Sequence, residues 1–147
     1  MKKIEMTRRV PATAEAAFDL SQDYDRRLQW DPFLREAKLL GASKAAVGVV
    51  ARCVSRLGIA MDTEYVAFRR PAVAAVKMTK GPKFLSHFSA SWNFREVSDG
   101  ETEIRFIYAF ELRGLFPQKP FKALIAQIFS FEMRRRLRPL SRALARP

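Results

Sequence analysis

The sequence has one cysteine and one histidine, and this scarcity excludes several kinds of chemistry. Cys53 has no partner for an intrachain disulfide, and no Cys-x-x-Cys pair is present for a zinc or redox site. His87 alternates with Phe88 in a strand-like stretch, which favours a surface position over a catalytic base or a metal ligand. We therefore expect no metal site and no cofactor, and no catalytic residue can be assigned.

A long apolar run is also missing. The most apolar stretch, 123–131, is interrupted by Gln127 and Ser130, whereas a membrane-spanning helix needs about 20 consecutive apolar residues. The positively charged N-terminus is not followed by the apolar segment of a secretory signal. The length of 147 residues, 48% of them apolar, suits one domain. We expect a single soluble, cytoplasmic domain over residues 1–147.

Acidic residues are few compared with basic ones. The chain has 15 Asp and Glu against 27 Lys and Arg, which gives a formal net charge of +12. Eight of the basic residues lie in 118–147, where Glu132 is the only acidic residue. This balance favours anionic partners, which would meet the C-terminal segment first.

Alternation of apolar and polar residues predicts strands through most of the first 113 residues. A short strand over 4–10 ends at Pro11, and two short helices follow over 14–20 and 25–30. Glycines, prolines and the hairpin signal Asp99-Gly100 then separate six further strands. Their expected ranges are 34–41, 47–57, 61–70, 73–80, 85–97 and 102–113.

One face of the last two strands is strongly aromatic. Its residues are Phe88, Ala90, Trp92, Phe94, Ile104, Phe106, Tyr108, Phe110 and Leu112. The corresponding side of the strand over 47–57 is small, with Val49, Ala51, Cys53 and Ser55. Bulky residues at one end and small ones at the other tend to leave volume unfilled on a concave sheet face.

A long helix is expected from Phe121 to near the end of the chain. Its apolar stripe recurs at spacings of three and four through Ile125, Phe129, Met133, Leu137, Leu140 and Leu144. Pro139 should kink the helix or start a new segment, because proline in a helix interior costs about 3 kcal/mol. The expected fold class is α+β, with a curved antiparallel sheet around this helix. A pocket of roughly 300–1,000 Å³ is expected between them.

Two segments within this element order resemble the START-like superfamily, also called SRPBCC or birch-allergen-like. The first, 10–33, reads Val-Pro-Ala-Thr-Ala-Glu-Ala-Ala-Phe-Asp-Leu and ends in Leu-Gln-Trp-Asp-Pro-Phe. The second contains Gly81-Pro82, Ser-Trp-Asn-Phe over 91–94 and Asp-Gly-Glu-Thr-Glu-Ile over 99–104, similar to the polyketide cyclase/dehydrase subgroup. The resemblance covers essentially the whole chain. It implies a START-like ligand-binding domain with the helix-grip fold, in the order β-α-α-β6-α, and a long apolar cavity.

The residues expected to line this cavity are mostly aromatic. Tyr65 and Tyr108 would each need a partner for a buried hydroxyl, which a ligand, the backbone or water can supply. The other candidates, for which core packing is an equal alternative, are Trp30, Met78, Phe88, Trp92, Phe106, Phe110, Ile125 and Phe129. Asp31 is interpreted as a turn former rather than an acid, and Asp62 with Glu64 is a weak acidic candidate.

Three functions remain open at this point. The first is binding or carriage of a small hydrophobic molecule, either a lipid or an aromatic or polyketide-like compound. The second is an enzyme of the polyketide cyclase/dehydratase type, because the superfamily contains both carriers and aromatase/cyclases and the fold alone does not choose between them. The third is an interaction protein whose basic C-terminal helix contacts a membrane or a ribosome.

The basic helix has two interpretations of its own. Its Arg134, Arg135, Arg136 and Arg138 could face an anionic membrane, but a solvated face near the helix C-terminus explains them as well. No aromatic residues interleave with these arginines, which argues against nucleic acid as the partner. The oligomeric state does not follow from the sequence.

Overall fold

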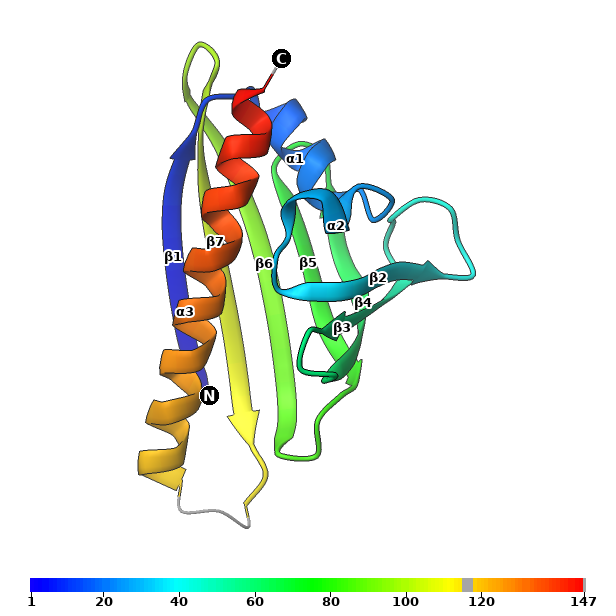
Figure 1. Cartoon of the computed structure of the whole chain (residues 1–147), viewed down its shortest axis with the longest axis vertical. Helices are drawn as coiled ribbons and strands as arrows, with labels where there is room; N and C mark the ends of the chain where they lie inside the picture. The colour runs from blue at the N-terminus through cyan, green and yellow to red at the C-terminus, as the bar shows by residue number, and fades with distance from the viewer. Residues whose placement is uncertain (115–117, 147) are drawn as a thin grey trace.

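The computed structural model describes residues 1–114 and 118–146, and its seven strands form one antiparallel sheet in the order β1-β7-β6-β5-β4-β3-β2 (Figure 1). The strands are β1 Lys2–Val10, β2 Leu34–Leu40, β3 Val50–Ser55, β4 Ala60–Arg69, β5 Val73–Lys80, β6 Leu85–Ser98 and β7 Glu101–Leu112. The helices are α1 Ala14–Gln22, α2 Arg27–Trp30 and α3 Gln118–Ala145. This is the α+β helix-grip fold that the sequence predicts.

Local sequence explains where several elements begin and end. The Thr13 side chain accepts a hydrogen bond from the backbone N–H of Ala16 at 3.2 Å and so caps the start of α1. The β6–β7 hairpin turns at Gly100, whose φ of 75° is available to glycine because it has no Cβ. Gly48 has a φ of 88°, which explains why β3 begins at Val50 and is shorter than the predicted strand over 47–57.

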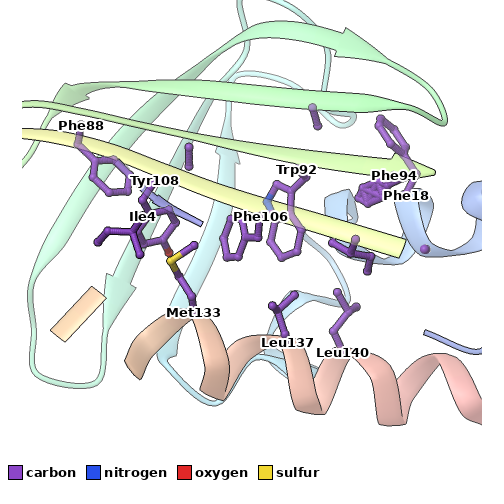
Figure 2. Packing of buried hydrophobic residues seen from close by; sticks show 14 of the residues in the cluster. Ile4, Phe18, Phe88, Trp92, Phe94, Phe106, Tyr108, Met133, Leu137 and Leu140 are labelled. Atoms are coloured by element: carbon purple, nitrogen blue, oxygen red, sulfur yellow. The ribbon is translucent and has the colours of Figure 1, made fainter. Parts of the chain in front are cut away.

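The core lies between the concave face of the sheet and α3. Trp92 on β6 and Phe106 on β7 stack with ring centroids 3.9 Å apart. Figure 2 shows Met133, Leu137 and Leu140 of α3 pointing toward these rings. All three α3 residues are buried, so the inward stripe predicted for the C-terminal helix is confirmed.

Pro139 does not interrupt the C-terminal helix. The structure has α3 as one helix from Gln118 to Ala145 with Pro139 inside it, so the predicted new helical segment is wrong. Leu137 and Leu140 flank the proline and are 3% and 0% exposed. Fully burying one leucine contributes about 1.5–3 kcal/mol, so burial of this pair is large enough to offset the cost of about 3 kcal/mol for an interior proline.

Within residues 1–114 and 118–146, no helix is long and apolar enough to cross a membrane.

Candidate functional site

A group of charged and polar side chains lies inside the fold, where α2, β7 and α3 meet. Arg27 comes from α2, Asp31 directly follows α2, and Tyr108 comes from β7. Glu132 and Arg136 lie one turn apart on α3. We call these five residues the buried polar cluster. Charged side chains are rarely buried unless they are paired, so their partners decide what the cluster can do.

Asp31 brings two guanidinium groups together. Its Oδ2 accepts hydrogen bonds from Nε of Arg27 and Nε of Arg136, both at 3.0 Å. Its Oδ1 accepts from the backbone N–H of Phe33 at 3.1 Å, which confirms the interpretation of Asp31 as a turn former. Burial by itself would raise the pKa of Asp31, but the charges of Arg136 and Arg27 and these hydrogen bonds outweigh it and lower the pKa. Asp31 is therefore an ionised carboxylate.

Arg136 also contacts Tyr108 and Glu132, through its Nη1 atom. The Tyr108 hydroxyl donates to Glu132 Oε1 at 3.0 Å, and Nη1 of Arg136 donates to both the hydroxyl and Oε1, at 2.6 and 3.1 Å. Burial raises the pKa of Glu132, although the charge of Arg136 and the hydrogen bond from Tyr108 act in the opposite direction. Burial also holds the pKa of Tyr108 well above its usual value. The arrangement thus places a carboxyl with a raised pKa beside a neutral phenol.

Aromatic rings surround the Arg27 guanidinium. Its carbon atom Cζ lies 4.9 Å from the ring centre of Trp30, 5.6 Å from that of Tyr24 and 5.9 Å from that of Trp92. Such cation–π contacts stabilise a cation that has lost water. The indole Nε1 of Trp30 is fully buried and has no hydrogen-bond partner among the described residues.

Tyr65 belongs to a second buried group next to the first. Its hydroxyl donates to Gln22 Oε1 at 2.7 Å, and Gln22 Nε2 donates to Ser21 Oγ at 2.9 Å. Burial raises the pKa of Tyr65, so the hydroxyl stays neutral. Both predicted cavity tyrosines are therefore hydrogen-bonded to other side chains, and neither depends on the backbone or on a ligand for a partner.

The ten predicted cavity residues all belong to one apolar core. Eight are buried, and Met78 and Phe129 are partly buried and pack against the others; the buried ones are Trp30, Tyr65, Phe88, Trp92, Phe106, Tyr108, Phe110 and Ile125. The ring of Phe129 lies 5.1 to 5.5 Å from those of Phe88, Tyr108 and Phe110. These side chains occupy space between the sheet and α3.

One pocket of the described structure lies away from the position predicted between the sheet and α3. It has a volume of about 660 Å³ and is lined from α1, the α1–α2 connection, β2, the β2–β3 connection and the end of β4, with Phe18, Gln22, Tyr24, Leu39, Ala42 and Phe68 among its residues. None of the ten predicted cavity residues lines it. Near α3, the Arg136 guanidinium lies over the ring of Phe106, with Cζ 5.8 Å from the ring centre.

Two residues on the wall of this pocket also contact the buried groups. Gln22 lines the pocket and accepts the hydrogen bond from Tyr65. Tyr24 lines the pocket and packs against Arg27. The pocket and the buried side chains thus share a wall.

Arg27 and Arg136 were missed as site residues by sequence reasoning. Arg136 was placed with Arg134, Arg135 and Arg138 on a face open to solvent or membrane, and this is wrong for Arg136, which is 8% exposed. The spacing held a usable signal, because Arg136 follows Met133 by three and precedes Leu140 by four, and both of these belong to the buried stripe. Arg27 precedes Asp31 by four residues, a spacing that allows an ion pair along a helix.

The family match extends along nearly the whole chain. A family model described as polyketide cyclase/dehydrase and lipid transport matches residues 1–145. The chain belongs to this family. A search of curated proteins finds no match.

Solved structures with the same fold as this polyketide cyclase/dehydrase family member include an aromatase/cyclase. Zhui aromatase/cyclase from a Streptomyces species has a TM-score of 0.82 at 15% identity, covering 97% of this chain and 93% of that one. A START superfamily protein from Mycobacterium smegmatis has a TM-score of 0.80 at 13% identity, covering 97% and 99%. Norcoclaurine synthase from Thalictrum flavum has a TM-score of 0.73 at 12% identity, covering 97% and 86%. At these identities the likeness shows the fold.

In this family member, the buried polar cluster offers hydrogen-bond donors to an oxygen atom. The Nη2 atoms of Arg27 and Arg136 make no hydrogen bond among the described residues. Such nitrogens can bind a carbonyl or carboxylate oxygen. No group of three His, Cys, Asp or Glu side chains among the described residues is placed to hold a metal ion.

Proposed function

We propose that this protein binds or carries a small, mostly apolar molecule in the pocket between α1 and the β2–β3 connection. The observation that carries the proposal is the shared wall: Gln22 and Tyr24 line the pocket and also contact Tyr65 and Arg27. An apolar body would lie on rings of the pocket, and a polar oxygen would point toward the hydrogen-bond donors behind them.

The dimensions and lining of the pocket support this function. A volume of about 660 Å³ falls in the range of about 300–1,000 Å³ usual for small-molecule sites. Phe18, Tyr24, Leu39 and Phe68 supply apolar surface, and charged side chains such as Asp19, Lys44 and Arg70 are also among the lining residues. Membership in a family described by polyketide chemistry and lipid transport agrees with an apolar ligand.

The proposal is tested by filling the pocket from its exposed rim. Ala42 lines the pocket and is exposed, whereas Ala46, four residues later in the same connection, is exposed and does not line it. We expect Ala42→Phe to weaken binding of the reporter dye anilinonaphthalene sulfonate by at least about tenfold, equivalent to about 1.4 kcal/mol. Ala46→Phe should bind as the wild type does. Equal affinities for all three proteins would contradict the proposed site.

A second function, proton transfer on a bound carbonyl compound, is favoured by the contacts of Tyr108. The sequence showed no base or acid beside this tyrosine, but Glu132 and Arg136 hydrogen-bond to it. A carboxyl with a raised pKa beside a phenol and a guanidinium is a suitable acid–base pair for a cyclase or dehydratase.

Replacement of Tyr108 by phenylalanine separates the two functions. In a carrier with its ligand in the pocket beside α1, Tyr108→Phe should leave ligand binding nearly unchanged, because Tyr108 does not line the pocket and its hydroxyl is bonded to Glu132 and Arg136. In an enzyme, the same change should reduce turnover of a poly-β-keto thioester by about 10²–10⁴-fold with little change in substrate affinity. We expect the first result, and a large loss of turnover with binding preserved would promote the cyclase.

A further inference from the structure

The outward side of α3 carries a second regular stripe of side chains. Six residues recur at spacings of four and three and so share one helix face: Leu124, Ile128, Phe131, Arg135, Arg138 and Arg142. We call them the outer stripe. Its three apolar side chains are 47% to 57% exposed, and its three arginines are also exposed. The stripe is therefore apolar toward the start of α3 and cationic toward its end.

The turn between β3 and β4 extends the apolar surface beyond the helix. Leu57, in this turn, is 86% exposed. Leu57 and Arg56 line a smaller pocket of about 220 Å³ together with Phe131 and Arg135 of the outer stripe. The turn and the helix therefore form one continuous surface. Neighbouring exposed apolar side chains of this size mark interaction sites more often than isolated ones do.

Unpaired cations surround these apolar side chains. Arg56, Arg134, Arg135 and Arg138 are exposed, and none of them forms an ion pair within the described residues. The guanidinium of Arg35 lies beside Gly58 in the same turn. Glu132, the only acidic residue of α3, is directed inward to Tyr108 and Arg136. The surface thus carries cations without carboxylates of its own.

We propose that this surface docks on an anionic lipid membrane. The apolar side chains Leu57, Ile128 and Phe131 would enter the boundary between headgroups and acyl chains, and the arginines would contact lipid phosphates. This combination of exposed apolar groups and cations matches both parts of such a surface.

The charge pattern disfavours other occupants. A second copy pressed on the same surface would bring arginines against arginines with no carboxylate between them, which like-charge repulsion opposes. A nucleic acid would satisfy the arginines through its phosphates, but it would not bury Leu57 or Ile128 in an apolar environment. An anionic membrane offers negative charge and an apolar interior at the same face.

The docking surface lies immediately outside the buried polar cluster. Phe33, which lines the smaller pocket, donates its backbone N–H to Asp31. Phe131 and Arg135 each precede a member of the cluster, Glu132 and Arg136. Membrane docking does not depend on the proposed ligand, and its test below uses no ligand.

Sedimentation with lipid vesicles tests the proposal on the full chain. We expect the protein to sediment with vesicles of three parts phosphatidylcholine to one part phosphatidylglycerol, but not with pure phosphatidylcholine. Binding should fall steeply between about 0.1 M salt, where the Debye length is about 10 Å, and about 1 M, where it is about 3 Å. Absence of binding to the anionic vesicles at the lower salt concentration would overturn the proposal.

Two pairs of substitutions locate the contact on the docking surface. Leu57→Ser with Phe131→Ser should weaken binding at least about tenfold, because two large apolar side chains are no longer transferred from water into the lipid. Arg134→Gln with Arg135→Gln should weaken it about 25-fold, from a loss of about fivefold for each cation. All four residues are exposed, so the fold should persist, which circular dichroism checks.

Matched pairs elsewhere on the surface serve as controls. Val47→Ser with Val66→Ser, and Arg8→Gln with Arg69→Gln, remove the same kinds of exposed group away from the docking surface. These variants should bind nearly as the wild type does. If the arginine control weakens binding equally, net charge alone drives it and the assigned surface is wrong. The proposal would also be overturned if the wild-type protein forms a dimer and does not bind vesicles, and if Leu57→Ser with Phe131→Ser dissociates that dimer. The surface would then be a contact between copies.

Discussion

At the scale of single residues, Asp31 makes the burial of two arginines possible. It is 1% exposed and is shared by Arg27 and Arg136, which are 4% and 8% exposed. A buried ion pair that loses one partner leaves an uncompensated charge in a medium of low dielectric constant. The ionised Asp31 carboxylate should therefore contribute strongly to the free energy of unfolding.

Asp31→Asn is expected to lower the free energy of unfolding by about 3–5 kcal/mol, because the amide keeps the shape of the side chain but not its charge. The measurement is urea denaturation at neutral pH. Asp19→Asn is the matched control, since Asp19 also binds an arginine, Arg70, but both side chains are 53% exposed and solvent screens the pair. A loss at Asp31 no larger than that at Asp19 would contradict the role of the buried polar cluster.

The raised pKa of Glu132 gives a distinct pH dependence. The pKa of this carboxyl is higher in the folded protein than its usual value of about 4.3. The contribution of Glu132 to stability is therefore complete below the usual pKa and declines as the pH rises through the folded pKa. Glu132→Gln removes this decline and keeps an oxygen for Tyr108. We expect the variant to gain stability relative to the wild type as the pH rises through this window, as measured by urea denaturation at several pH values.

Glu111 provides a control of opposite sign. Hydrogen bonds to Lys122 and the N-terminus lower its pKa, so its contribution is present above the usual pKa of about 4.3 and is lost as the pH falls. Glu111→Gln should therefore lose stability relative to the wild type as the pH rises through this range. The same sign of pH dependence for both variants would contradict the assignment at Glu132.

At the scale of elements, periodicity predicted most of the strands and α3 because one face of each is buried. The strand at β4 was predicted as well, but periodicity did not assign its faces, because register irregularities lie between Asp62 and Thr63 and between Tyr65 and Ala67. Tyr65 and Phe68, three residues apart, consequently face the same side, with ring centroids 5.3 Å apart. Regular alternation would place these two residues on opposite faces of the strand, and it cannot locate a β-bulge that changes this. The weak acidic candidate Asp62 pairs with Arg52 at 2.8 and 2.9 Å.

Pro139 offers a test of how packing shapes α3. An interior proline costs a helix about 3 kcal/mol, while proline also restricts the unfolded chain by about 0.4–1 kcal/mol. We therefore expect Pro139→Ala to raise the free energy of unfolding by about 2 kcal/mol in urea denaturation. Pro120→Ala, in the first turn of α3 where proline is tolerated, should instead lower it slightly. A loss of stability in Pro139→Ala would show that the proline contributes a contact that alanine lacks.

At the scale of the whole molecule, the family and fold follow from the sequence far better than the site does. The aromatic faces of β6 and β7 and the inward stripe of α3 predicted the core correctly, since each depends only on spacing within one segment. The larger pocket depends on the α1–α2 and β2–β3 connections, which have no periodicity. The ion pair between Asp31 and Arg136 joins residues 105 positions apart, a separation at which spacing carries no information.

The central claim concerns the whole molecule: we propose that the pocket beside α1 binds a small apolar molecule. The protein, produced in its own host and purified without organic solvent, can be compared by native and denaturing mass spectrometry. Wild-type protein and Ala46→Phe should carry a noncovalent small-molecule mass that disappears on denaturation, and Ala42→Phe should lack it. An adduct that Ala42→Phe retains in full, or wild-type protein that shows only its own mass, would contradict the account.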